Sequence, residues 1–254
     1  RHFAGLADQG EPSLNIGIQV CLLLDAVIAR AIEVAGTNKF SRNSRQELAL
    51  GALLATILEK ARSVASCLRN GDATGAYILL RSVLEAYVDL CNLASSPEYL
   101  ESMGASFYDQ QRKFIRNATR PGNANPFLRA LGGNPEIATE LERLNAQLAD
   151  LQARGIAPLT AKQRFERANL LDYYEGPYAS LCQKSHNNLS ALVSRHLPVG
   201  PSGPELVLSS PPRQEDYSMI ADLTAGIAAD ATARVNSFLT GGAPVGLEPL
   251  TRDL

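Results

Sequence analysis

The sequence has few of the residues and none of the short motifs that identify common enzyme classes. It contains three histidines and four cysteines, with no Cys-x-x-Cys pair and no Glu-x-x-His spacing. The ligand patterns of zinc sites and of carboxylate-bridged di-iron bundles are therefore missing. The Gly-x-Ser-x-Gly elbow of serine hydrolases, the glycine-rich dinucleotide fingerprint and the P-loop are absent as well. We expect no metal ion and no other cofactor.

The sequence also lacks an excess of one charge and a long apolar run. Its net charge of −2 gives no overall attraction to nucleic acid or to an anionic membrane. The apolar run at residues 16–24 is too short to span a bilayer, and no basic segment with a small-residue cleavage site precedes it. The isolated cysteines, each in an apolar helical run, indicate reduced thiols. We therefore expect a cytoplasmic protein that does not bind a membrane.

The sequence is rich in helical periodicity. Of its 254 residues 45% are hydrophobic and 20% charged, enough for a substantial core. Strand-like alternation is almost absent, and Ser44-Arg-Gln-Glu47 is a capping box that opens a helix. We predict an all-α bundle of about seven helices. The segments with helical spacing are 13–35, 44–70, 72–93, 97–119, 135–154, 160–171, 177–196 and 214–239.

Proline, glycine and asparagine gather at residues 121–135, which predicts a loop. We expect residues 1–120 and 172–240 to form the core of the bundle. Residues 121–171 would then be a loop and helical hairpin insertion, and residues 241–254 a flexible tail.

A polar stripe runs along the most apolar helix that we predict, at residues 76–94. Arg81 and Glu85 lie one helical turn apart on one face, and Asp89 continues it. Charges are rarely buried without a partner. Three interpretations remain open: a buried ion-pair network that fixes helix register, a solvated face, or a functional cleft.

His186 occupies the predicted helix 177–196 and shares a face with apolar residues. Its neighbours Ser185 and Asn187 are polar and have poor propensity for a helix interior. A histidine held near a carboxylate can act as a general base or as a pH-sensitive switch. The alternative is a histidine that is hydrogen-bonded within the core.

A third feature is a basic segment near the end of the helix predicted at 97–119. Its cations alternate with Phe114, and Phe127 follows, a combination that can hold single-stranded nucleic acid through phosphate contacts and base stacking. A solvated helix end is the other explanation. The basic residues are Arg112, Lys113, Arg116, Arg120 and Arg129.

Two stretches resemble a known family: Leu80-Arg-Ser-Val-Leu-Glu-Ala-Tyr-Val-Asp-Leu90 and Tyr178-Ala-Ser-Leu-Cys-Gln-Lys-Ser-His186. They are similar to an uncharacterised family of bacterial helical proteins with HEPN-like architecture. HEPN domains are helical bundles found among toxins, defence systems and RNA-cleaving enzymes. Catalytic members carry an arginine and a histidine close together on one helix, whereas here only Arg81, from another helix, can supply the cation. The resemblance therefore implies an all-α, HEPN-like fold more directly than RNA cleavage.

Our leading hypothesis is a defence- or toxin-type protein that binds or cleaves RNA or a nucleotide, with Arg81, Glu85 and His186 as catalytic residues. The sequence leaves open whether the protein is an enzyme; if so, we expect phosphodiester or nucleotide chemistry. The alternative is a non-catalytic interaction module whose polar cluster is structural. A second copy of the chain is a further candidate partner. The candidate binding residues are Ser185, Asn187, Asp89, Arg112, Lys113, Arg116 and Arg120.

Overall fold

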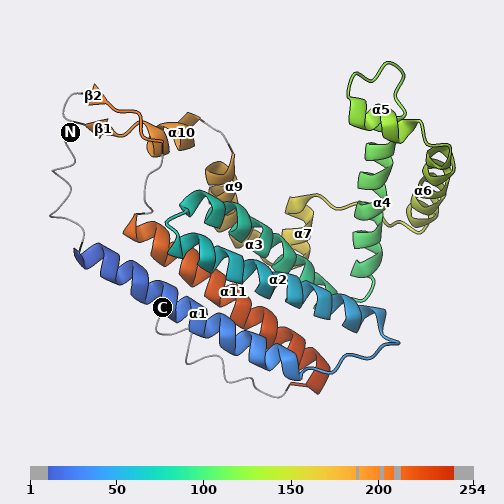
Figure 1. Ribbon diagram of the computed structural model, residues 1–254. Helices are drawn as coiled ribbons and strands as arrows, with labels where there is room; N and C mark the ends of the chain where they lie inside the picture. The colour runs from blue at the N-terminus through green and yellow to red at the C-terminus, as the bar shows by residue number, and fades with distance from the viewer. Residues whose placement is uncertain (1–10, 187–188, 201–202, 209–212, 243–254) are drawn as a thin grey trace. The chain divides into compact units, whose positions relative to one another are not determined.

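The computed structural model describes residues 11–186, 189–200, 203–208 and 213–242, and these are mostly helical (Figure 1). The described strands, β1 (Val199–Gly200) and β2 (Gly203–Pro204), form one short antiparallel ladder. The prediction of an all-α chain is confirmed. None of the described helices is both long enough and apolar enough to cross a membrane.

The chain divides into two compact units. The first contains the residues up to Ala94 and from Phe165 onward, and the second contains Ser95–Arg164. The predicted insertion at 121–171 stays a prediction, and most of the predicted tail lies outside the described residues. The first unit holds α1 (Glu11–Thr37), α2 (Arg45–Arg69), α3 (Ala73–Ser95, whose last residue falls in the second unit), α8 (Leu171–Tyr173), the π-helix η1 (Tyr174–Tyr178), α9 (Ala179–Ser185), α10 (Leu189–His196) and α11 (Gln214–Thr240).

The second unit holds α4 (Tyr99–Ala118), α5 (Pro126–Gly132), α6 (Glu136–Ala153) and most of α7 (Ala161–Arg167). The predicted loop at 121–135 is wrong over its second half, because α5 forms there. Asn125 caps this helix, since its side-chain oxygen accepts from the backbone N–H groups of Phe127 and Leu128 at 3.0 and 3.3 Å. Pro126 suits the first helical position, where no N–H is needed.

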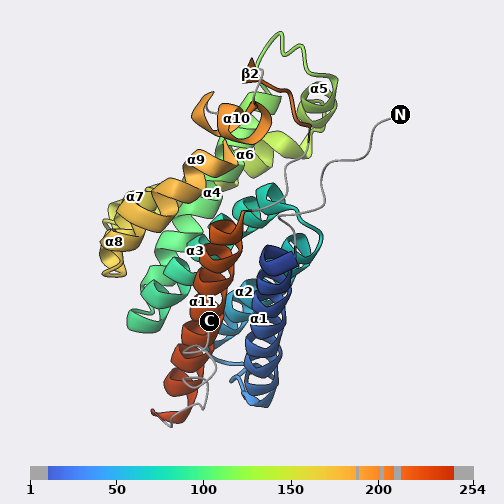
Figure 2. The same ribbon diagram turned by 90° about the vertical axis from the view of Figure 1, so that its left-hand side faces the viewer.

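The core of the first unit lies where α1, α2 and α11 run side by side, as both ribbon views show (Figures 1 and 2). Helix α3 buries twelve of its 23 residues, against eleven of 27 in α11. Leu80, Leu84 and Leu90 are fully buried on it. Burial of each leucine contributes about 1.5–3 kcal/mol. A rigid α3 therefore fixes where its polar side chains emerge.

The starts of α2 and α3 show how local sequence sets these helices. Ser44 Oγ accepts from the Glu47 backbone N–H at 3.2 Å, as a capping box requires. The Glu47 carboxylate, however, accepts from the backbone N–H of Ser41 at 2.7 Å, so the box closes one turn earlier than predicted. At the start of α3, Asp72 Oδ1 accepts from the Gly75 N–H at 2.8 Å.

The predicted continuous helix 177–196 is wrong. Helix α9 ends at Ser185, and His186 follows with extended backbone angles, φ −97° and ψ 155°. The Ser185 hydroxyl donates to the Leu181 carbonyl at 2.6 Å, and such side-chain bonds compete with the helix backbone. Upstream, Pro177 lies inside the π-helix instead of at the first position of a helix. The break leaves His186 exposed at the end of α9.

Candidate functional site

Arg81 is the centre of a polar cluster that joins α3 to the segment around α9. Its Nε lies 3.3 Å from Glu85 Oε1, one turn along α3. Its Nη1 lies 3.2 Å from Nε2 of His186, a residue 105 positions away in the sequence. The side chains of Arg81 and Glu85 are 29% and 30% exposed, and His186 is exposed. The structure thus brings the three predicted catalytic residues together at a surface; their catalytic role stays a prediction.

Tyr178 completes the cluster. Its hydroxyl donates to Glu85 Oε1 at 2.8 Å and accepts from Arg81 Nη2 at 3.4 Å. Burial and the bond to Glu85 raise the pKa of Tyr178 to about 12, so the phenol keeps its proton at neutral pH. The ring packs against the buried Phe165 and stacks on Tyr174, with centroid distances of 5.0 and 5.5 Å. Tyr178 therefore holds both charged partners in place.

The contact between Arg81 and His186 fixes the role of the imidazole. A guanidinium has only donors, so Nε2 of His186 must accept and the ring proton is placed on Nδ1. The hydrogen bond with Tyr178 is the main cause that raises the pKa of Arg81, which remains a cation. The unprotonated Nε2 of His186 can act as a base, and the Arg81 guanidinium beside it can bind an anion.

The Arg81 Nε is a buried donor with no aligned hydrogen bond. Glu85 lies close enough for an ion pair, at 3.3 Å, but not in line with the N–H bond. Arg81 and Glu85 therefore attract each other electrostatically, but the Nε–H group does not donate an aligned hydrogen bond to Glu85. Buried polar atoms without a hydrogen-bond partner are uncommon in proteins.

The other residues predicted around His186 are less informative. Ser185 turns its hydroxyl back to the carbonyl of Leu181 in its own helix. Asp89 is half-buried one turn beyond Glu85, and its binding role stays a prediction. Asn187 lies outside the described residues.

A second polar cluster adjoins the first along α3 and α9. Lys184 Nζ lies 2.5 Å from the Tyr77 hydroxyl and 3.0 Å from Asp216 Oδ1, and the Tyr77 hydroxyl also donates to Asp216. Arg213 Nε lies 3.2 Å from Asp216 Oδ2. Burial opposes ionisation of Asp216, but the hydrogen bonds from Tyr77, Arg213 and Lys184 outweigh it and lower its pKa to about 2. This carboxylate is therefore fixed and ionised at neutral pH.

A cavity of about 500 Å³ lies beside this second cluster. Lys184, Arg195 and Arg213 line it from three different segments, together with Tyr77 and Asp216. Cavities of this size hold small ligands such as nucleotides. Arg81, Glu85 and His186 do not line it, so their cluster is a neighbouring surface site.

Sequence reasoning missed Tyr178, Lys184 and Asp216 as parts of these clusters. The only local signal was the spacing of Tyr77, Arg81 and Glu85, which places one polar group on each successive turn of α3. Asp216 begins α11 and meets Tyr77 from 139 positions away, a pairing that no local pattern encodes.

The basic segment belongs to the second unit, mainly on α4. Arg112 and Lys113 both pair with Asp109, each at 2.6 Å, and Lys113 contributes most to lowering the pKa of that carboxyl. Arg116 and Arg120 are exposed. Two of the five cations thus have an acidic partner already, and nucleic-acid binding here stays a prediction. Phe114 and Phe127 are 42% and 68% exposed, as base stacking requires.

Within the described part of the chain, no group of three or more His, Cys, Asp or Glu side chains is placed to hold a metal ion. All four cysteines are free.

The profile of a family of unknown function, DUF5677, matches residues 47–200, more than half of the chain. The match contains Arg81, Glu85, Tyr178 and His186. No curated protein and no solved structure matches the chain. The chain therefore belongs to DUF5677, a family of unknown function.

Proposed function

We propose that this protein is a cytoplasmic, HEPN-like protein of the defence or toxin type that binds RNA and cleaves its phosphodiester bonds at Arg81 and His186. The observation that carries the proposal is the 3.2 Å contact between Arg81 Nη1 and His186 Nε2 at an exposed surface. A cation that binds phosphate and a neutral imidazole are the two groups that ribose-assisted cleavage needs.

The chemistry follows from the two side chains. A phosphate oxygen replaces His186 as the acceptor of the Arg81 Nη1 donor, which frees the lone pair on Nε2. Nε2 then takes the proton of the ribose 2′-hydroxyl, and the resulting oxygen attacks the adjacent phosphorus. The bond from phosphorus to the 5′ oxygen breaks, and the imidazolium returns its proton to that leaving oxygen. Arg81 stabilises the charge that develops on the non-bridging oxygens.

Glu85 and Tyr178 act through Arg81 in this scheme. Glu85 pairs with the guanidinium, and the Tyr178 hydroxyl bonds to both groups. Holding Arg81 in one orientation before the substrate arrives lowers the reorganisation needed in the transition state.

The resemblance to HEPN domains supports the proposal. In this proposal Arg81 on α3 and His186 at the end of α9 take the roles of the arginine and histidine that catalytic HEPN ribonucleases carry on one helix. The resemblance is also the basis on which we propose a bacterial origin and a role in defence.

A non-catalytic interaction module is the second candidate. The mutual contacts of Arg81, Glu85 and Tyr178 favour it, because side chains that hold one another can serve only to fix the packing of α3 against η1. The exposure of His186 favours the first candidate, since packing alone does not require a histidine there.

The test is an incubation of the protein with end-labelled single-stranded RNA and with DNA of the same sequence. We expect cleavage of the RNA only, because DNA lacks the 2′-hydroxyl. His186→Ala should abolish cleavage, while His196→Ala should retain it, since His196 contacts the Val207 carbonyl instead. Equal cleavage of RNA and DNA would contradict the mechanism. Failure of the wild type to bind or cleave RNA at low salt would favour the interaction module.

A further inference from the structure

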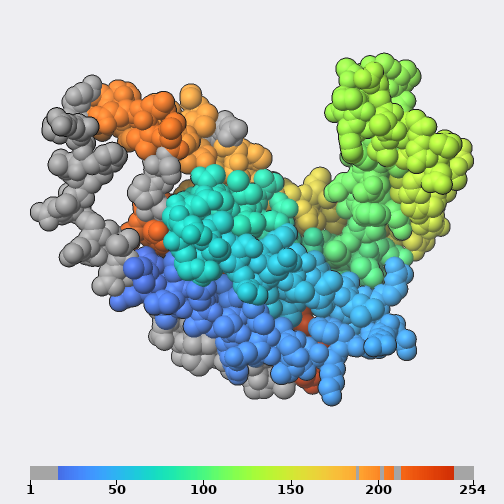
Figure 3. All heavy atoms as spheres, in the orientation of Figure 1, coloured from blue at the N-terminus to red at the C-terminus, as the bar shows by residue number. Residues whose placement is uncertain are grey.

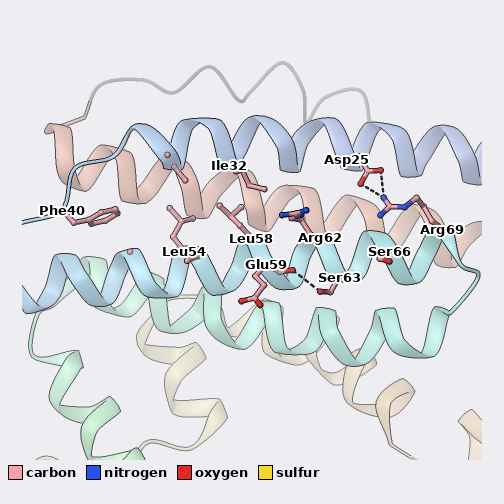
Figure 4. A pocket seen from close by; sticks show the side chains of 14 residues that line it. Asp25, Ile32, Phe40, Leu54, Leu58, Glu59, Arg62, Ser63, Ser66 and Arg69 are labelled. Carbon is pink, nitrogen blue, oxygen red and sulfur yellow. Dashed lines mark hydrogen bonds and ion pairs between the residues drawn. The ribbon is translucent and has the colours of Figure 1, made fainter.

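A groove runs along the surface between α1 and α2, away from the site described above (Figure 4). Its volume is about 960 Å³. One half is apolar, with Ile32, Leu58 and Phe40 in its lining, and the other half holds the ion pair between Arg69 and Asp25 (Figure 4). Both helices reach the surface on the face shown in Figure 3.

The exposed side of α2 has the spacing of a helix that packs against another helix. Its outward positions alternate by four and three residues, the interval of a coiled-coil seam. Three of the seven positions, Ala52, Ala55 and Ser66, hold small residues, which let two helix backbones approach closely. The positions are Leu48, Ala52, Ala55, Glu59, Arg62, Ser66 and Arg69.

Helix α1 lines the groove with Ile32 and Asp25, and it carries further exposed apolar side chains nearer its N-terminus. Ile18 and Leu22 are 54% and 64% exposed, and Ile32 is 38% exposed. The opposite side of α1 is already used inside the unit, because Leu24, Ile28 and other residues there are buried. Exposed apolar side chains that gather on one face mark interaction surfaces more often than isolated ones do.

The charges on the stripe indicate which partner fits. Glu59 and Arg62 lie near the middle of α2, and both side chains line the groove. Within the part of the chain that the structure describes, neither side chain forms an ion pair. When a second α2 runs antiparallel about a two-fold axis between positions 60 and 61, each Glu59 faces the Arg62 of the other copy. The same register places the small residue Ala55 opposite Ser66. The stripe is therefore complementary to itself, as a two-fold interface requires.

We propose that the α1–α2 groove is the interface of a homodimer, in which α2 of each copy packs antiparallel on α2 of the other with Glu59 opposite Arg62. The inference is independent of RNA cleavage, because none of the residues involved belongs to the Arg81 cluster.

The test is a charge exchange followed by sedimentation equilibrium at several protein concentrations. We expect the wild type to dimerise in the micromolar range. Glu59→Arg places cations opposite one another and should weaken the dimer on the order of tenfold or more. The double variant Glu59→Arg/Arg62→Glu restores both opposite-charge pairs and should restore dimerisation.

The matched control is Glu33→Arg on α1. Glu33, like Glu59, is an exposed glutamate three residues from an arginine, but it forms an ion pair with Arg30 at 3.0 Å and does not line the groove. It should leave the dimer unchanged, and circular dichroism melting should show that every variant is folded. A wild type that stays monomeric at high concentration would overturn the proposal. So would a Glu59→Arg variant that dimerises normally, or a double variant that does not recover.

Discussion

Replacing Asp216 with Asn tests whether the second polar cluster, formed by Tyr77, Lys184, Arg213 and Asp216, stabilises the first unit. The substitution keeps the size of the side chain and its acceptor for the Arg213 backbone N–H, but it removes the charge that Lys184 and Arg213 bind. The Asp216 side chain is only 10% exposed, so solvent screens these contacts weakly. The loss therefore reports on the contacts of the ionised carboxylate with Tyr77, Arg213 and Lys184 together.

The magnitude follows from the pKa of Asp216. Folding lowers that pKa from 3.8 to about 2, and at about 1.4 kcal/mol per pH unit the ionised form gains about 2 kcal/mol. Because the folded-state pKa lies below the unfolded one, this stability is present above pH 3.8 and is lost as the pH falls toward 2. Asp216→Asn should lower the unfolding free energy at pH 7 by about 2 kcal/mol, or roughly 4 to 8 °C in Tm.

The assay is urea unfolding between pH 7 and pH 2, followed by circular dichroism. The variant should also lose the part of the acid sensitivity that Asp216 causes between pH 4 and 2. Asp222→Asn is the matched control, since Asp222 is exposed on the same helix. An Asp216→Asn variant as stable as wild type at pH 7, with unchanged acid sensitivity, would refute the reasoning.

Two further substitutions test the neighbouring features. Tyr178→Phe removes the hydroxyl that joins Glu85 to Arg81. It should lower the unfolding free energy measured in urea by about 1 kcal/mol and slow RNA cleavage. An unchanged rate of cleavage would show that the hydroxyl does not position Arg81. Replacing basic residues of the segment with Ala should weaken RNA binding and flatten its dependence on salt in filter-binding titrations, because fewer phosphates are neutralised. His186→Ala should leave RNA binding nearly intact. Binding that survives the change would place the contact with RNA elsewhere. The combined substitution replaces Arg112, Lys113, Arg116 and Arg120 with Ala.

Much of the first cluster could be predicted from the sequence, because helical spacing alone places Arg81 and Glu85 on one face. The polar run around His186 predicts a special site, but the continuous helix predicted across it is wrong. The run ends α9 instead of forming part of a longer helix, because a serine back-bond and poor helix formers favour a break there.

The second cluster could not be predicted for a different reason. Tyr77 reads as one more core aromatic on α3, and Lys184 as a solvated charge on α9. Their meeting with Asp216 depends on how α3, α9 and the start of α11 pack, which is a property of tertiary structure. The outward stripe of α2 could be predicted in part. Its spacing is a local feature of the sequence, but only the fold shows which side of the helix α1 and α11 cover.

The most direct test of the central claim is the single-turnover rate of RNA cleavage by Arg81→Ala, His186→Ala and the variant with both changes. If the two side chains act as one catalytic unit, each single substitution should slow cleavage by on the order of a hundredfold or more, and the double variant should be little slower than either. Losses that multiply in the double variant, or a His186→Ala variant that cleaves at the wild-type rate, would contradict the account.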